Sequence, residues 1–370
     1  MVLADLSLIN FKNYSEASLD FDSNVNIFTG LNGQGKTNLL DAIHYLSTCK
    51  SYFNPIDSQN IHHGEDFFVV EGVFQNGEGS DKIYCGVKRG QKKVFRKNKT
   101  DYERLAEHVG QFPAVVISPY DKDLISEGSE VRRRFTDSII SQYNRRYLDH
   151  LIDYNKILKQ RNSLLKYFWE NRTFDADNLE VWSMQLCDLA EKIFAERQQF
   201  IAEFTPVFLA HYNAISGGGE EVGVRYRSDL DGGDFAETLA QSLEKDRRTS
   251  YTNVGIHKDD LRLTIDGHPL KKFGSQGQQK TFLIALKLAQ FDLVKQATGR
   301  MPVLLLDDIF DKIDDVRVQH LMHLVNDHNF GQIFITDTHA GRVREIFSGI
   351  ARSVKVFDVK KGEVHEAQGQ

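Results

Sequence analysis

A glycine-rich segment near the N-terminus has the residue types and the spacing of a phosphate-binding loop. It follows an apolar stretch, Val25–Thr29, and opens a predicted helix over Asn38–Leu46. Glycines let backbone N–H groups wrap phosphate oxygens, and the start of the helix adds its partial positive charge. Lys36 would reach the β- and γ-phosphates and Thr37 would ligate Mg²⁺, so the segment predicts a nucleoside triphosphate ligand. The candidate ligand-binding residues are Gly30, Leu31, Asn32, Gly33, Gln34, Gly35, Lys36, Thr37 and Asn38.

Two carboxylates form a second candidate site element about 270 residues further along the chain. Val303–Leu306 is a continuous apolar run of the kind found in a buried strand, and Asp307 and Asp308 follow it directly. At the carboxyl end of such a strand, Asp307 would hold Mg²⁺ through water and Asp308 would accept a proton from the attacking water. An isolated pair of aspartates also fits a solvated loop, but the phosphate-binding loop favours the catalytic interpretation.

A third element, Gly274-Ser-Gln-Gly-Gln-Gln279, lies directly before a predicted helix over residues 276–296. A serine and a glycine at the start of a helix form another anion site, here with Ser275, Gly277 and Gln278. One triphosphate does not need two such sites from one chain. We therefore expect the second site to close over the γ-phosphate bound by another subunit, so that the nucleotide holds a homodimer together.

The elements that must position these residues fall into two kinds. Residues 129–216 contain no glycine and show apolar stripes at 3- and 4-residue steps, which predicts two antiparallel helices of about 25–35 residues joined near residues 171–178. Both ends of the chain have the sequence pattern of an α/β fold, and Asp266-Gly267 is predicted to form a hairpin turn. The predicted fold class is α/β: a mixed-sheet lobe built from both termini, residues 1–112 plus 247–370, and an inserted, mostly helical lobe, residues 113–246. The predicted strands are residues 6–9, 19–21, 25–29, 67–74, 83–87, 261–265, 303–306 and 332–336.

Composition adds few restrictions. The 370 residues include 46 Lys and Arg against 52 Asp and Glu, a formal charge of −6, which by itself argues against a nucleic-acid partner. No apolar run is long enough for a membrane span, and the N-terminus does not resemble a signal peptide. Three widely spaced cysteines exclude a zinc ligand set and disfavour a disulfide framework, so we expect a cytoplasmic protein without a membrane partner.

The three motifs, in this order, resemble the ATP-binding-cassette (ABC) superfamily, and specifically the ATPase heads of the SMC and Rad50 class. Five further passages resemble the RecF family of bacterial recombination and gap-repair proteins, and the likeness extends from Leu3 to about Phe357. These passages are residues 117–124, 130–137, 158–162, 255–261 and 275–280.

The resemblance implies ATP and Mg²⁺ as cofactors, with Walker A at residues 30–37, Walker B at residues 303–308 and the signature motif at residues 275–278. It also implies a D-loop at residues 310–314, a switch histidine at His339, and nucleotide contacts from Lys12 and Asn13. Asp308 stands where most cassette ATPases carry Glu, which fits slow hydrolysis. The Q-loop is expected within Ser118–Leu124. For His257, a structural role is slightly favoured over a catalytic one.

Local clusters of positive charge oppose the inference from net charge. Residues 82–104 carry nine Lys or Arg against two acids, and residues 131–161 carry eight against three. Because phosphate contacts need only local cations, both clusters are candidates for duplex DNA, although each also fits a solvated face. The arginines at 132–134 also fit a role in bracing the ATP site. The candidate DNA contacts are Lys88, Arg89, Lys92, Lys93, Arg96, Lys97, Lys99, Arg132 and Arg133.

The predicted function is an ATP-gated DNA clamp and recombination mediator with Asp308, Lys36 and His339 as catalytic residues. By resemblance to RecF proteins, it would be a slow DNA-dependent ATPase that recognises duplex, gapped or junction DNA. It would assist RecO and RecR in loading RecA during gap repair, replication restart and the SOS response. The alternatives are a transporter's nucleotide-binding subunit, an SMC-like structural ATPase and a small-molecule P-loop kinase.

Overall fold

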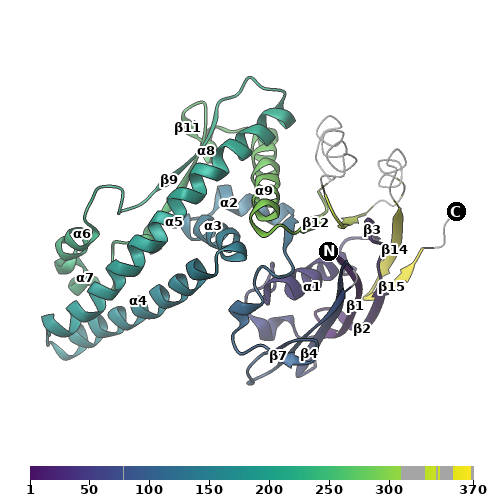
Figure 1. Cartoon of the computed structure of the whole chain (residues 1–370), viewed down its shortest axis with the longest axis horizontal. Coiled ribbons are helices and arrows are strands. Elements are labelled where there is room, and N and C mark those ends of the chain that lie inside the picture. The colour runs from purple at the N-terminus through teal and green to yellow at the C-terminus, as the bar shows by residue number, and fades with distance from the viewer. Residues whose placement is uncertain (78, 310–329, 339–340, 342–352, 368–370) are drawn as a thin grey trace. The chain divides into compact units, whose positions relative to one another are not determined.

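The structure, a computed structural model, describes residues 1–77, 79–309, 330–338, 341 and 353–367 (Figure 1). The chain divides into two compact units. Unit 1 contains residues 1–121, 214–216 and 284–370, and unit 2 contains residues 122–213 and 217–283. Unit 1 is therefore built from both ends of the chain, with unit 2 inserted between them.

The nucleotide-binding motifs of unit 1 lie on a six-stranded sheet. Five of its strands are parallel, and β15 is antiparallel to its neighbour β14. Because parallel strands end at the same edge, the loops that follow β3, β12 and β13 lie together there. The strand order is β15 (Glu363–Glu366), β14 (Val354–Lys360), β3 (Val25–Thr29), β13 (Ile333–Asp337), β12 (Val303–Asp307) and β8 (Ala114–Ile117).

A second, antiparallel sheet completes unit 1. Helix α1 (Lys36–Thr48) contacts strands of both sheets, and its buried Leu39, Ile43 and Leu46 share one apolar core with them. Burial of this helix between two sheets fixes the position of the phosphate-binding loop at its start. The strand order is β2 (Tyr14–Asp20), β1 (Val2–Phe11), β4 (Phe67–Asn76), β5 (Gly79–Lys88), β6 (Val94–Lys97) and β7 (Thr100–Asp101).

Unit 2 is dominated by the two predicted long helices, α4 (Arg145–Asn171) and α5 (Ala176–Ser216). Hydrogen bonds join Asn144 to Glu196 and Arg161 to Ser183, so the helices run antiparallel. At 1.5 Å per residue, the 27 residues of α4 extend about 40 Å and the 41 residues of α5 about 60 Å. Helix α5 is longer than the predicted 25–35 residues, and it continues through Pro206. The remaining helices of this unit are α2 (Asp123–Ser126), α3 (Ser129–Tyr143), α6 (Phe235–Gln241), α7 (Leu243–Thr249) and α8 (Leu270–Phe273).

A three-stranded antiparallel sheet lies in unit 2, in the order β11 (His268–Pro269), β10 (Asp260–Ile265) and β9 (Val222–Arg227). The predicted Asp266-Gly267 turn joins β10 to β11, and both of its residues have positive φ, 48° and 74°. Helix α9 (Gln276–Thr298) begins in this unit and ends in unit 1.

The predicted α/β class and all eight predicted strands are confirmed, whereas the compact units depart from the expected lobe boundaries. Residues 113–121 fall in unit 1 because β8 pairs with β12, and residues 247–283 fall in unit 2 because β10 pairs with β9. In the described part of the chain, no helix combines the length and the apolarity that a membrane span requires.

Candidate nucleotide-binding site

The phosphate-binding loop connects β3 to α1, as the sequence predicts. Lys36 is the first residue of α1, and its ammonium group donates to the backbone oxygens of Gly30 (2.8 Å) and Leu31 (3.3 Å). The ammonium is therefore held over the loop instead of extending into solvent, and the Lys36 side chain is almost fully buried. A cation in this position, beside the start of a helix, favours a bound polyphosphate.

Two glycines of the loop are required by their surroundings. Gly30 has φ 148°, and a Cβ there would lie 2.3 Å from the backbone oxygen of Val359. Gly35 has φ 118°, and a Cβ there would lie 2.3 Å from the amide nitrogen of the Asn13 side chain. Only glycine meets both the backbone conformation and the space at these positions.

The turn between β1 and β2 packs directly against the loop. The Asn13 side chain donates to the backbone oxygen of Gln34 (3.0 Å) and accepts from Asn38 (2.6 Å). Tyr14 donates to the backbone oxygen of Gly35 (3.0 Å). The structure thus places Asn13 and Asn38 at the loop, where nucleotide contacts were predicted. The Lys12 ammonium is instead ion-paired with Asp41 of α1 at 2.5 Å.

The loop and the Walker B strand meet through side chains. Thr37 donates to Asp307 Oδ1 at 2.8 Å, although 270 residues separate the two in sequence. Thr336 at the end of β13 donates to the same oxygen at 2.8 Å and accepts from the backbone N–H of Asp308 at 2.9 Å. Thr336 therefore links the Asp307 carboxylate to the backbone of Asp308. The role of Thr336 was not predicted from the sequence, because it depends on the register that places Thr336 opposite Asp307.

The environment of the two aspartates suits a cation. Burial raises the pKa of Asp307 to about 6, against the opposing effect of the hydroxyl groups of Thr37 and Thr336. A buried carboxylate with a raised pKa is stabilised in its charged form by a bound cation. Asp308 adopts φ 45°, a left-handed conformation uncommon outside glycine. Thr37 Oγ1 and Asp307 Oδ1 together form an oxygen donor set that fits Mg²⁺.

The signature segment forms a reciprocal cap at the start of α9. The backbone N–H of Ser275 donates to Gln278 Oε1 (2.7 Å), and the backbone N–H of Gln278 donates to Ser275 Oγ (3.2 Å). This capping box satisfies two backbone groups. Ser275 is exposed, and its hydroxyl proton has no acceptor among the described residues. The segment predicted to bind an anion is thus a capped, solvent-facing helix start.

The predicted Q-loop region contains a buried ion pair that the sequence did not predict. Asp121 lies 3.1 Å from the ammonium group of Lys287 on α9, and both side chains are buried in unit 1. Tyr52 donates to Asp121, and the Asp121 carboxylate also accepts from the backbone N–H of Ser118 (2.7 Å). Asp121 is thereby fixed at the last residue before the chain enters unit 2.

The predicted DNA contacts at residues 88–99 divide into engaged and unengaged cations. Lys93 pairs with Asp57 at 2.8 Å, Arg96 with Asp101 at 2.5 Å, and Lys97 with Asp81 at 3.0 Å. The exposed cations of this segment are Lys88, Arg89, Lys92 and Lys99. Among the described residues, Lys88, Lys92 and Lys99 have no ion-pair partner.

Arg132 and Arg133 serve the interior of unit 2. Arg132 forms a bidentate pair with Asp260 at 2.6 and 3.2 Å. Arg133 donates to the backbone oxygen of Asp259 at 2.6 Å, and burial lowers its pKa. His257 is held between Tyr154 (2.7 Å) and the backbone oxygen of Thr252 (3.0 Å). Both arginines were candidates for DNA contacts, but both donate hydrogen bonds within the protein.

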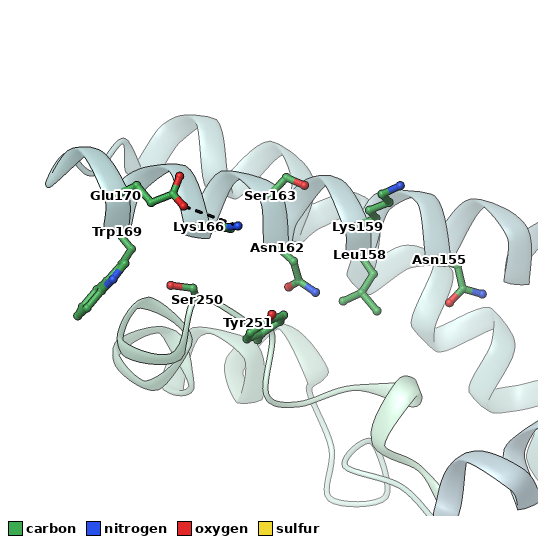
Figure 2. A pocket seen from close by; sticks show the side chains of 10 residues that line it. All are labelled: Asn155, Leu158, Lys159, Asn162, Ser163, Lys166, Trp169, Glu170, Ser250 and Tyr251. Atoms are coloured by element: carbon green, nitrogen blue, oxygen red, sulfur yellow. Dashed lines mark ion pairs between the residues drawn. The ribbon is translucent and has the colours of Figure 1, made fainter.

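A pocket of about 470 Å³ lies elsewhere in unit 2, between α4 and the turn at Ser250 and Tyr251 (Figure 2). Trp169 and Tyr251 are mostly exposed beside it, and Lys166 pairs with Glu170 at 3.6 Å. No residue of the nucleotide motifs lines it. His339 and the predicted D-loop, residues 310–314, lie outside the described residues, so their predicted roles stay predictions.

Comparison with known proteins agrees with these features. A profile of the RecF/RecN/SMC N-terminal domain matches residues 2–365. The DNA replication and repair protein RecF of Flavobacterium johnsoniae is 50% identical over 359 residues, covering 97% of this chain and 100% of that protein. The RecF of Phocaeicola vulgatus is 49% identical over 368 residues, covering 99% and 98%.

Solved structures show the same relationship. A solved structure of the recombination mediator protein RecF with ATP, in the RecFOR pathway, matches with a TM-score of 0.90 at 30% identity, covering 99% of this chain and 97% of the other. An Smc head from Pyrococcus furiosus matches with a TM-score of 0.56 at 15% identity, covering 99% and 96%, which shows a shared fold. The chain has the ABC-type ATPase head fold and belongs to the RecF family.

Proposed function

We propose that this chain is an ATP-dependent DNA-binding recombination mediator whose subunits dimerise when ATP is bound. The observation that carries the proposal is the junction of Thr37, Asp307 and Thr336, which joins the phosphate-binding loop to the Walker B strand through one carboxylate oxygen. Two related solved structures of RecF, one with ATP and one with ATPrS, support ATP as the nucleotide.

The proposed site binds the triphosphate through the loop residues 30–38, with Lys36 on the β- and γ-phosphates. Thr37 and Asp307 would hold Mg²⁺, which neutralises charge on the phosphate oxygens. Asn13 would reach the nucleotide from the β1–β2 turn, since it already contacts the loop. Lys12 is ion-paired with Asp41, so we assign it to positioning this turn.

Hydrolysis in this proposal uses Asp308 as the base. A water molecule attacks the γ-phosphorus, its proton passes to the Asp308 carboxylate, and the bond to the β-phosphate oxygen breaks to give ADP and phosphate. Thr336 holds the backbone of Asp308 through the 2.9 Å hydrogen bond to its N–H. His339 would hold the γ-phosphate or the attacking water. The shorter Asp side chain in place of Glu supports slow turnover, so ATP would act as a switch.

Dimerisation is proposed to occur through the signature segment. Ser275 and Gly277 of one subunit would cap the γ-phosphate bound to the other, with Gln278 holding the helix start in place through the capping box. The exposed hydroxyl group of Ser275 has a proton to donate to a phosphate oxygen. In this scheme, hydrolysis and loss of the γ-phosphate remove the contact that holds the two subunits together.

The proposed partners are duplex DNA, gapped or junction DNA, RecO and RecR, and the proposed location is the cytoplasm. The relationship to RecF proteins, and to a solved RecF structure from the RecFOR pathway, supports these assignments. The exposed cations Lys88, Arg89, Lys92 and Lys99 remain candidates for phosphate contacts, whereas Arg132 and Arg133 do not. We expect DNA to stimulate the slow ATPase activity.

The test is fluorescence anisotropy of a labelled duplex at two salt concentrations, with and without ATP and Mg²⁺. The expected result is ATP-dependent binding that weakens steeply as salt increases. Lys36→Ala should lose the ATP-dependent part, while Lys50→Ala, which removes an exposed lysine after α1, should retain it. Equal duplex binding by the wild type with and without ATP would contradict the proposed function.

A further inference from the structure

The three-stranded sheet of unit 2 presents three arginines on one face. Strands β9 and β10 pair so that Arg225 lies directly opposite Arg262, and Arg227 lies opposite Asp260. Side chains two residues apart on a strand share a face, so Arg225, Arg227 and Arg262 project together. All three are exposed.

This arrangement is unfavourable for the isolated chain. Like charges directly opposite each other on neighbouring strands destabilise the sheet. The carboxylate opposite Arg227 offers no compensation, because both oxygens of Asp260 are engaged by Arg132. Among the described residues, none forms an ion pair with Arg225, Arg227 or Arg262. The strand register therefore places three arginines without an ion-pair partner among the described residues on one face, which an external polyanion would stabilise.

The rest of the face identifies the kind of partner. Its other residues are Asp260, Pro269 of β11, and the opposed pair Gly223 and Thr264, and none of them is a large apolar side chain. Protein partners are usually anchored by buried aromatic or aliphatic groups, which this face does not offer. Arginine suits phosphate because its planar donor group binds two oxygens at once. Arg225 and Arg227 are about 6.7 Å apart along the strand, which is about twice the axial rise between phosphates of one DNA strand.

We propose that this face, defined by Arg225, Arg227 and Arg262, binds the phosphate backbone of duplex DNA. The inference rests on the proposed function, and it adds a contact surface in unit 2 that is separate in sequence from the predicted cluster at residues 88–99. Apart from the arginines themselves, this surface has no side chain suited to hydrogen bonding with base edges in a groove. It would therefore supply affinity for DNA without sequence preference.

The test compares two double variants of the full chain with the same change in charge. Arg225→Gln with Arg262→Gln removes the opposed pair. Lys245→Gln with Arg248→Gln removes two exposed cations of α7 and serves as the control. Duplex affinity is measured by anisotropy with ATP and Mg²⁺ at several salt concentrations, together with the melting temperature and the ATP-dependent association of each protein.

The sheet variant should bind duplex at least tenfold more weakly at low salt, and the salt dependence of its log affinity should be shallower by about 2, since each phosphate contact contributes about 0.9. Its melting temperature should equal or exceed that of the wild type, and its ATP-dependent association should be unchanged. The control should bind as the wild type does.

Wild-type affinity and salt dependence in the sheet variant would overturn the proposal, and an acidic protein would then become the better candidate for this face. A lowered melting temperature, which would mean that the arginines support the fold, would also overturn it. Failure of the wild type itself to bind duplex in the presence of ATP would instead refute the proposed function, and the inference with it.

Discussion

Replacing Thr336 with valine isolates the least expected residue of the site. Valine has nearly the same shape, so Thr336→Val removes the hydroxyl that donates to Asp307 and accepts from the N–H of Asp308 while leaving the buried packing unchanged. A hydrogen bond to a charged group contributes about 1.5–3 kcal/mol. If that loss falls on the hydrolytic step, kcat falls about 10- to 100-fold, because each 1.4 kcal/mol corresponds to a factor of about ten.

The pH dependence separates a positioning role from a simple loss of packing. The Thr336 hydroxyl lowers the pKa of Asp307, which burial has raised to about 6. Without the hydroxyl the pKa rises further, so a larger fraction of Asp307 is protonated near neutral pH and unable to ligate Mg²⁺. The deficit of Thr336→Val relative to the wild type should therefore grow as the pH falls from 8 to 6.

The assay is steady-state ATP hydrolysis across this pH range, with nucleotide affinity and the unfolding midpoint measured in parallel. Thr136→Val is the matched control, since Thr136 is equally buried but its hydroxyl only donates within helix α3. Wild-type hydrolysis by Thr336→Val, or equal losses in the two variants, would refute the assigned role. A deficit that does not depend on pH would refute the coupling to Asp307.

Three further predictions follow from the same structure. Lys36→Ala should abolish ATP binding in calorimetry, because Lys36 is the cation at the centre of the loop, whereas Lys99→Ala should bind normally. Ser275→Arg should bind ATP as a monomer but fail to dimerise in sedimentation experiments. Ser275→Asp, which retains a helix-capping acceptor, should also fail to dimerise. Undiminished association of either variant would show that this segment does not cap the nucleotide. Burial lowers the pKa of His108 from 6.5 to about 4 in the folded protein. As the pH falls from about 6.5 towards 4, the imidazole is therefore protonated in the unfolded state before it is protonated in the folded state, and the free energy of unfolding decreases. At pH 5.5 the loss of stability is about 1 kcal/mol. The urea unfolding midpoint of His108→Gln should therefore change less between pH 7.5 and 5.5 than that of the wild type or of the control variant His268→Gln.

Local sequence signals predicted most of the fold. The strands carry short β-rich runs between turn residues, and the long helices lie in a stretch of 88 residues without glycine. Helix α5, at 41 residues, is longer than the predicted 25–35 residues and contains Pro206 in its interior. The lobe boundaries differed because they depend on strand pairing between distant segments, such as β8 with β12 and β9 with β10.

The candidate site was predictable where its chemistry lies in one segment. The loop residues and Asp307 come from short motifs, but the role of Thr336 depends on its register opposite Asp307 across two parallel strands. Charge clusters were less informative, because sequence alone does not show where an acidic partner lies. Arg132 is 128 residues from its partner Asp260 in sequence, and the opposed Arg225 and Arg262 lie in no basic run at all.

Sedimentation velocity of the wild-type chain, with ATP and Mg²⁺ and without them, tests the central claim that ATP joins two subunits. We expect a monomer without nucleotide, a dimer with ATP, and a return to monomer as ATP is hydrolysed to ADP. The same sedimentation coefficient under all three conditions, in a protein shown by calorimetry to bind ATP, would contradict it.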